Sequence, residues 1–304
     1  MTEDYEKLVS DHWSQMAKQK IGLFHWSDSS IVMQNINKCI SGNPDMGWFQ
    51  YACEKYLLKD SNGVNSGLSI GCGSGGLERH CRLINACQTI DAIDLAEGAI
   101  EEAKKLADEK KITGINYQVK NIENISLPKE KYDVVFASSA IHHVKNLEAL
   151  FEQIRFSLKP FGLFIMLEYV GPSQFQFTKK SCDLINELLN ILPKEYRKLS
   201  SNPVKTKDVF TKATIDMMNI SDPSEAIRSA EIIPLLSRYF TILEKKDYGG
   251  TILHMLLQDI IANFNHDDYR DKTVLKLLIF LENILINEKV IESDFAFLVA
   301  SKLV

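Results

Sequence analysis

The sequence predicts an α/β fold in which a largely parallel sheet carries helices on both faces. Short apolar runs of strand length alternate with amphipathic helical segments from residue 66 to residue 169. A glycine-rich turn follows the first run directly, and two further strand-length runs come late in the chain. Such alternation is typical of βαβ units, whose strands pair in parallel.

The N-terminal 60 residues are predicted to be helical, because their apolar positions recur at helical intervals between interruptions at "HWSDSS" and "SGNPDMGW". We therefore expect an N-terminal helical cap over residues 1–60 and an alternating core over residues 61–170. The core strands are expected at residues 66–71, 89–94, 115–120, 132–138 and 162–169.

After residue 170 the alternation stops. Helical segments at 181–199 and 223–239 predict an insertion over residues 171–236, which we expect to form a lid over the substrate. Residues 237–304 are expected to complete the same domain, with strands at 240–250 and 294–303 and with helices at 251–264 and 272–286 between them.

Composition excludes several classes of protein. The chain has 304 residues, 45% hydrophobic and 25% charged, which is enough to bury a full core. Its net charge of -5 creates no positive electrostatic potential that would attract a phosphate backbone, so nucleic acid is not expected as a partner. No run of 18 apolar residues or signal peptide is apparent, and six cysteines without C-x-x-C spacing suit reduced thiols. We expect a cytoplasmic protein without a membrane partner.

The stretch "GLSIGCGSGGLERHC" carries the strongest functional signal. Gly71, Gly73 and Gly76 satisfy G-x-G-x-x-G between a strand and a helix, where bare backbone N–H groups can approach a ligand. Asp94 ends the next strand, where its carboxylate can accept hydrogen bonds from a ribose diol. These residues indicate an adenosine-type ligand and leave open whether it is NAD, FAD or another. An oxidoreductase would normally devote its second half to a substrate domain, which this chain lacks.

Three longer stretches then add a family resemblance. "LSIGCGSGGLE", "DAIDLAEGAIEEAKKLA" and "YDVVFASSAIHHVKNLEALFEQIRFSLKPFGLFIMLEY" resemble, in order, the motifs of class I S-adenosylmethionine-dependent methyltransferases over roughly residues 64–170. The resemblance implies a Rossmann-like, doubly wound, seven-stranded sheet whose last strand is antiparallel, and S-adenosylmethionine as cofactor. It implies these cofactor-binding residues: Gly71, Cys72, Gly73, Gly75, Asp94, Leu95, Asn121, Ile122 and Ser138.

Two positions depart from the family pattern. Ser69 stands where members often have an acidic residue, which puts in doubt a contact from that position to the cofactor's amino group. Asn121 replaces an acidic residue that faces the adenine amine, although its amide oxygen can still accept that hydrogen bond.

His142 and His143 follow the fourth predicted strand, at the edge where open α/β sheets bind ligands. Either imidazole is a candidate general base. We expect only one to face the acceptor, because adjacent residues point different ways, and related methyltransferases favour His142. A purely structural role in the loop stays open. No metal is predicted, because no further His, Asp or Glu spacing supports one.

Trp26, Glu168 and Tyr169 are expected to bind the substrate, with core packing as the alternative for Trp26 and Tyr169. The predicted function is methyl transfer from S-adenosylmethionine to an oxygen or nitrogen of a small acceptor, such as a sugar, a glycan precursor or a secondary-metabolite intermediate. The alternatives are an NAD(P)-dependent oxidoreductase and a catalytically inactive S-adenosylmethionine-binding partner protein. A homodimer is left open.

Overall fold

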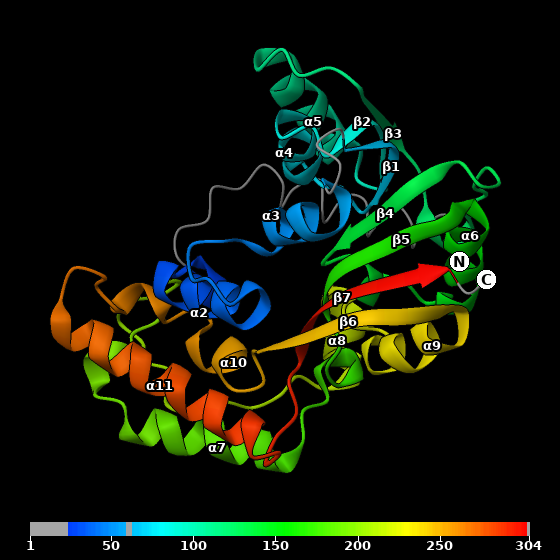
Figure 1. Cartoon of the computed structure of the whole chain (residues 1–304). Helices are drawn as coiled ribbons and strands as arrows, with labels where there is room; N and C mark the ends of the chain where they lie inside the picture. Colours follow the sequence, from blue (N-terminus) through cyan, green and yellow to red (C-terminus); the bar gives the residue numbers. More distant parts are fainter. Residues whose placement is uncertain (1–23, 59–62, 303–304) are drawn as a thin grey trace.

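The computed structural model, which describes residues 24–58 and 63–302, contains a seven-stranded mixed sheet (Figure 1). Its strand order is β3-β2-β1-β4-β5-β7-β6. The strands are β1 (Val64–Ile70), β2 (Cys87–Asp94), β3 (Ile115–Val119), β4 (Tyr132–Ser138), β5 (Leu158–Tyr169), β6 (Phe240–Gly249) and β7 (Phe295–Lys302). β1 to β5 pair in parallel, and β7 runs antiparallel to both β5 and β6. The predicted doubly wound sheet with an antiparallel last strand is therefore confirmed.

Side chains alternate between two apolar layers, one on each face of the sheet. In β4, Val134 and Phe136 belong to one cluster, and Val135 and Ala137 belong to the other. The first layer is covered by α2 (Ser30–Ser41), α3 (Trp48–Ala52) and α4 (Gly76–Leu83) (Figure 1). The helix α5 (Glu97–Glu109) lies beside β2 and β3. The second layer is covered by α6 (Leu147–Ser157) and α9 (Ile232–Tyr239).

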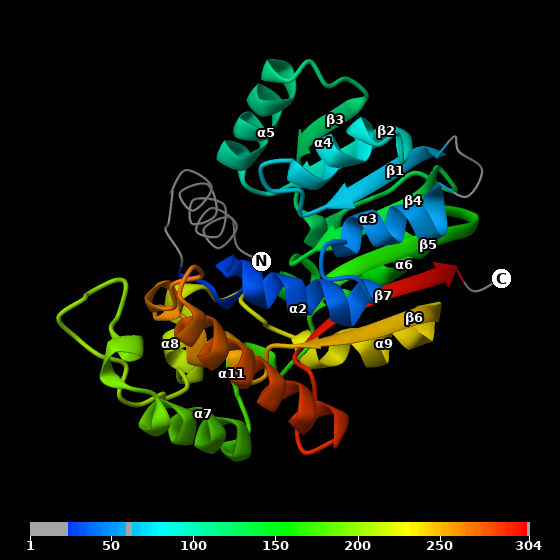
Figure 2. The same cartoon turned by 60° about the vertical axis from the view of Figure 1, so that its left-hand side comes forward.

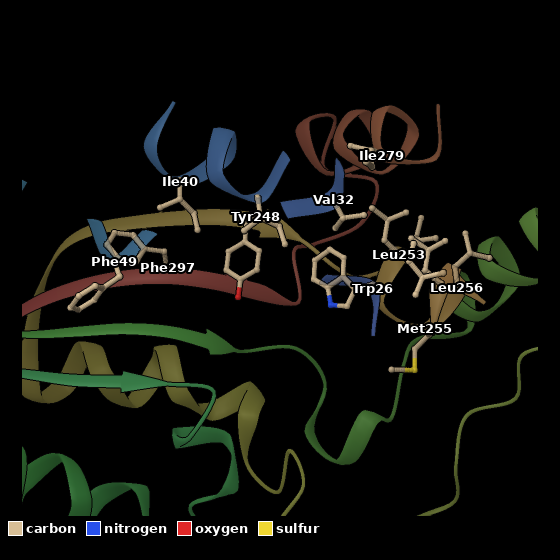
Figure 3. Packing of buried hydrophobic residues seen from close by; sticks show 14 of the residues in the cluster. Trp26, Val32, Ile40, Phe49, Tyr248, Leu253, Met255, Leu256, Ile279 and Phe297 are labelled. Atoms are coloured by element: carbon tan, nitrogen blue, oxygen red, sulfur yellow. The ribbon is translucent and has the colours of Figure 1, made fainter. Parts of the chain in front are cut away.

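The late part of the chain forms a helical lobe beyond the end of β6 and the start of β7 (Figure 2). The lobe contains α7 (Lys179–Ile191), α8 (Ile215–Ser221), α10 (Leu253–Leu257) and α11 (Tyr269–Asn287). Figure 3 shows how Trp26, Val32, Leu253 and Ile279 gather between α2, α10 and α11. This packing joins the described part of the predicted cap, residues 24–58, to the lobe. Residues 1–23, 59 and 60 of that cap lie outside the described residues.

The carboxylate of Glu282, which is fully buried on α11, ties the lobe to the sheet. One of its oxygens accepts hydrogen bonds from the N–H groups of Ile252 (2.7 Å) and Leu253 (2.9 Å), and the other accepts from Gly250 (3.0 Å). These donors lie where β6 passes into α10, a helix start without a side-chain cap of its own. Burial raises the pKa of Glu282, and the three N–H groups oppose that rise.

The predicted helix at 223–239 is wrong over its first half. The helix α9 begins only at Ile232, after the short 3-10 turn η7 (Ser229–Glu231), and Ala226 has a φ of +51°. At this turn the N–H of Ile227 is shared between the carbonyl of His142 (3.0 Å) and that of Ser224 (3.2 Å). The segment before α9 is thereby docked onto the loop after β4.

The predicted helix at 251–264 is likewise interrupted. It divides into α10 and the 3-10 turn η8 (Ile261–Asn263), with Asp259 at a φ of +64° between them. The Asp259 carboxylate accepts a hydrogen bond from the N–H of Ser201 (2.8 Å), and its backbone N–H donates to the carbonyl of Phe24 (2.9 Å). Among the helices that the structure describes, none is long and apolar enough to cross a membrane.

Candidate active site

The glycine turn between β1 and α4 has the backbone geometry that the sequence predicts. Gly71, Gly73 and Gly75 have φ values of +66°, +51° and +76°. A Cβ at Gly71 would lie 2.4 Å from the Cβ of Ala140, whereas one at Gly73 would meet no atom within 4 Å. Gly76 needs neither a positive φ nor close approach, because it is simply the first residue of α4. The turn therefore packs tightly against the loop after β4 and leaves Gly73 open.

Asp94 connects this turn to the next helix. Its Oδ2 accepts a hydrogen bond from the N–H of Gly73 (2.8 Å), and its Oδ1 accepts from Ala96 (2.9 Å) at the start of α5. Burial raises the pKa of Asp94, and the N–H donors oppose the rise. The N–H of Leu95 is a third backbone donor to Asp94. An ionised carboxylate has about four acceptor sites, so capacity remains for a ribose hydroxyl.

The other predicted cofactor residues lie along the same edge of the sheet. Leu95 follows β2 and is half-buried, and Asn121 caps the short turn η3 (Ile122–Asn124), its Oδ1 accepting from the N–H of Glu123 (2.9 Å). Cys72 lies in the glycine turn, and Ser138 ends β4 before Ser139, whose φ is +51°. Their contacts with a cofactor remain predictions.

Glu78 is a buried residue of this region that the sequence analysis missed. It lies in the first turn of α4 and is 0% exposed. Burial raises its pKa to about 7, while the nearby Ser69 hydroxyl opposes the rise and the charge of Asp94 adds to it. Ser69 is the residue of β1 that departs from the family pattern. The carboxyl group expected at that position in β1 is instead supplied beside it by Glu78 of α4. A glutamate in the first helical turn after the glycines was the available signal.

Glu168, near the end of β5, organises the loop after β4. It is 1% exposed, and its Oε2 accepts hydrogen bonds from the N–H groups of Ala140 (3.0 Å) and Ile141 (2.8 Å). Its Oε1 is hydrogen-bonded to Nδ1 of His142, on the 3-10 turn η4 (Ile141–His143). Burial lowers the pKa of His142, but the Glu168 carboxylate outweighs this, so the net shift is upward. The predicted contact of Glu168 with substrate remains a prediction, since the described contacts are with the loop.

The side chains of His142 and His143 both point toward the carboxylate of Glu225. The expectation that the two adjacent histidines point in different directions is therefore wrong. Their ring centroids are 4.1 Å apart, and their Nε2 atoms lie 3.5 Å and 3.9 Å from the two carboxylate oxygens of Glu225. Nδ1 of His143 is hydrogen-bonded to Ser224 Oγ (3.1 Å), which donates to Asp222 (2.6 Å). The reasoning against further ligands is also corrected, because the segment before α9 brings Glu225 to both histidines.

An aromatic cluster lies next to this group. The Tyr169 ring is 6.2 Å from that of His142, 5.1 Å from Phe295 and 6.4 Å from His254, and its hydroxyl donates to the carbonyl of Pro172. Trp26 is 1% exposed and packs 5.4 Å from Phe295. Core packing thus accounts for its position, and its contact with substrate remains a prediction.

His254 is a second buried residue that the sequence analysis missed, because "TILHMLL" has the pattern of a core helix. Burial holds its pKa well below the ordinary value, so the imidazole is neutral. Its Nδ1 and the Nε1 of Trp26 have no hydrogen-bond partner among residues 24–58 and 63–302. Two buried polar atoms in an aromatic cluster are groups that a polar ligand can satisfy.

Comparison with known proteins agrees with this geometry. Residues 68–166 match the family described as "Methyltransferase domain". Malonyl-acyl-carrier-protein O-methyltransferase 2 of Ilyobacter polytropus is 26% identical over 51% of this chain and 63% of its own length. The ubiquinone biosynthesis O-methyltransferase of Rickettsia bellii is 27% identical over 69% of this chain and 77% of its own length. Residues 68–166 of the chain therefore form a methyltransferase domain, as the class I resemblance of the sequence implies.

Solved structures show the same fold. Geranyl diphosphate C-methyltransferase of Streptomyces coelicolor A3(2) superposes with a TM-score of 0.55 at 10% identity over 98% of both chains. The cyclase SpnF gives a TM-score of 0.51 at 15% identity, covering 99% of this chain and 94% of its own. The chain spans less than two thirds of the length of the first curated relatives it matches.

S-adenosylmethionine is the cofactor of the methyltransferase domain, and the residues present fit it. Gly73 has open space where a ligand can approach the backbone, and Asp94 beside it retains acceptor capacity. An NAD(P)-dependent oxidoreductase, the main alternative at the level of the sequence, is not supported by any of these similarities.

We predict that Gly71→Ala unfolds more easily and loses cofactor affinity, while Gly76→Ala does neither. The alanine at 71 would combine a strained φ with a Cβ contact of 2.4 Å, whereas the position at 76 has room for a Cβ. Strain and overpacking each cost about 1–3 kcal/mol. Urea unfolding and calorimetric titration with S-adenosylhomocysteine measure both effects. Equal behaviour of the two variants would contradict the tight packing of the turn on Ala140.

We also predict that Glu78 makes the stability of the methyltransferase depend on pH. A carboxyl whose pKa rises on folding contributes stability below its ordinary pKa of 4.5, and that contribution is lost as pH rises through about 7. The stability of Glu78→Gln relative to the wild type should therefore increase from pH 5 to pH 8, by on the order of 3 kcal/mol at most. Thermal unfolding across this range tests it, with the exposed Glu101→Gln as control. A constant difference would show that Glu78 does not titrate there.

Proposed function

We propose that the protein transfers a methyl group from S-adenosylmethionine to an oxygen or nitrogen atom of a small-molecule acceptor. One observation carries the proposal: the glycine turn after β1 packs directly on the loop that bears the two histidines. Gly71 lies against Ala140, and Ala140 is held by the same carboxylate that binds His142. A cofactor bound on the glycine turn and an acceptor bound beside His142 would therefore lie next to each other, on either side of the contact between Gly71 and Ala140.

The chain's own residues would act mainly by positioning. When bound, S-adenosylmethionine supplies an electrophilic methyl group on a sulfonium. Asp94 and the glycine turn would orient that group, and Tyr169 and His254 would exclude water beside it. Correct alignment of two reactants is worth up to ~7–11 kcal/mol of the barrier.

An oxygen acceptor must also lose a proton. His142 is positioned to influence that step, because Glu168 fixes its ring through Nδ1 and directs Nε2 toward Glu225. A general base of this kind contributes about 10²- to 10⁴-fold. The role predicted for His142 is thus supported by its neighbours, with His143 in the same cluster as a second candidate.

The nature of the acceptor is proposed from the surroundings of the histidines. Ser224 and Glu225 belong to the insertion over residues 171–236, which supports the predicted lid. The named relatives include O-methyltransferases for malonyl-acyl-carrier protein and for ubiquinone biosynthesis, which is compatible with an oxygen acceptor. Sugars, glycan precursors and secondary-metabolite intermediates offer such oxygens. All six cysteines are free, in keeping with a cytoplasmic location.

We predict that the purified protein binds S-adenosylmethionine and S-adenosylhomocysteine and does not bind NAD. Asp94→Ala should weaken binding by about 10- to 100-fold, because hydrogen bonds to a charged group contribute about 1.5–3 kcal/mol. Asp108→Ala, on the exposed side of α5, should bind like the wild type. Isothermal titration measures all three ligands, and binding of NAD alone would overturn the proposal.

Methyl transfer itself is tested by the release of S-adenosylhomocysteine with panels of hydroxylated and amine acceptors. We expect turnover with at least one hydroxylated compound and loss of that turnover in His142→Ala. Cofactor binding without turnover on any compound of both panels would instead favour the inactive partner protein.

A further inference from the structure

We propose that His142, His143 and Glu225 bind a divalent transition-metal ion. The assignment of the site stands on the side chains alone. The role that we give the ion, holding an oxygen of the acceptor, rests on the proposed function.

Three candidate ligand atoms converge from two segments that are distant in sequence. One donor atom from each of the three residues lies within 4.8 Å of the other two. The Glu225 oxygens are 3.5 Å and 3.9 Å from the Nε2 atoms of His142 and His143. Two ligands at ~2.1 Å from a tetrahedral ion are about 3.4 Å apart, so closure needs movements of at most about 1.5 Å.

Both imidazoles are oriented in the way that metal-binding histidines are. A ligating histidine uses its second ring nitrogen on a carboxylate, a carbonyl or another polar partner, which fixes the ring and its tautomer. His142 uses Nδ1 on Glu168, and His143 uses Nδ1 on Ser224, whose hydroxyl donates to Asp222. Both rings therefore direct Nε2 toward the same carboxylate. A single general base would require only one of these arrangements.

Asp222 adds a further carboxylate to the histidine pair, and its charge is only partly compensated. It is 8% exposed, and its Oδ2 has no hydrogen-bond partner within the described part of the chain. That oxygen lies 4.0 Å from Nδ1 of His143. Asp222, Glu168 and Glu225 thus place three carboxylates around two imidazoles, and buried carboxylates are costly without a compensating cation.

The nearby arginine does not supply that cation. Arg228, three residues after Glu225, is bound to the carboxylates of Glu148 and Glu231 and to the carbonyl of Lys145. A bound divalent ion would offset the excess of negative charge at the histidine pair.

The ligand set favours particular ions. Two imidazole nitrogens and one carboxylate suit Zn²⁺, Fe²⁺ or another first-row transition metal, while Mg²⁺ and Ca²⁺ prefer oxygen ligands alone. Three protein ligands are typical of catalytic sites that keep a position open for water or substrate. The structural alternative, a fully ligated site, would need a fourth protein ligand.

An open position here would suit an acceptor hydroxyl. A metal ion lowers the pKa of a bound hydroxyl, so its proton passes to water and the oxygen's electron pair can form the new bond to the methyl carbon. The carbon–sulfur bond breaks at the same time, and its electron pair remains on sulfur as S-adenosylhomocysteine forms. In this arrangement His142 is a metal ligand and not the base, and the acceptor is an oxygen compound.

We predict that the protein, after treatment with EDTA and gel filtration, binds about one Zn²⁺ or Co²⁺ per chain. Titration calorimetry, elemental analysis and the visible spectrum of the Co²⁺ form measure the binding. His143→Ala and Glu225→Gln should each weaken Zn²⁺ binding by more than about 100-fold, and Glu168→Gln by about 10- to 100-fold. The exposed His80→Ala should bind Zn²⁺ like the wild type, and Mg²⁺ should bind far more weakly.

Circular dichroism checks that each variant is folded, and His143→Gln replaces His143→Ala if the latter is not. Wild-type affinity in folded His143 and Glu225 variants would overturn the metal site, as would the absence of Zn²⁺ binding by the wild type.

Methyl transfer is measured separately, with and without the metal. Full turnover by the EDTA-treated enzyme would remove the ion's role and leave His142 as the base, with the proposed function intact. If the protein binds Zn²⁺ specifically but binds no S-adenosylmethionine, the metal site is supported and the proposed methyl transfer is contradicted.

Discussion

The bond network of Glu168 is the interaction on which the rest of the candidate site depends. Irregular backbone that is buried needs hydrogen-bond acceptors, because unpaired N–H groups away from water are costly. The turn η4 has no side-chain cap of its own, and one carboxylate from the neighbouring strand satisfies Ala140 and Ile141 while also holding His142. Glu282 does the equivalent for the start of α10. Two buried glutamates therefore fix two of the segments that border the aromatic cluster.

The sequence predicts the parts of this molecule that depend on local pattern. The seven strands could be located because apolar runs, helix periodicity and the glycine turn are short-range signals. Positive φ at Gly71, Gly73 and Gly75 follows from the same stretch, and so does the place of Asp94 at the end of β2. Where a backbone N–H donates to a distant carbonyl, as at Ile227 and Asp259, the predicted helix breaks.

The parts that could not be predicted depend on long-range pairing. Nothing near His142 in the sequence indicates Asp222 or Glu225, and Glu225 lies in a segment predicted to be helical. Glu78 could have been connected with Ser69 only by knowing that the first turn of α4 lies against β1. His254 was concealed because a histidine inside an apolar helix has the same pattern whether it packs or binds. In each case the chemistry arises from partners that only the fold brings together.

The antiparallel last strand has a consequence for how such a protein can diversify. Because β7 runs against β5 and β6, β6 ends and β7 begins at the edge of the sheet that carries the glycine turn. The chain between them, with α10 and α11, is therefore the connection of a hairpin whose two strands pair in the sheet. Exchanges at positions of this connection outside its core contacts can reshape one wall of the site while the strand pairing and the glycine turn are kept. Selectivity can in this way change next to the cofactor edge without a change in the order of the strands.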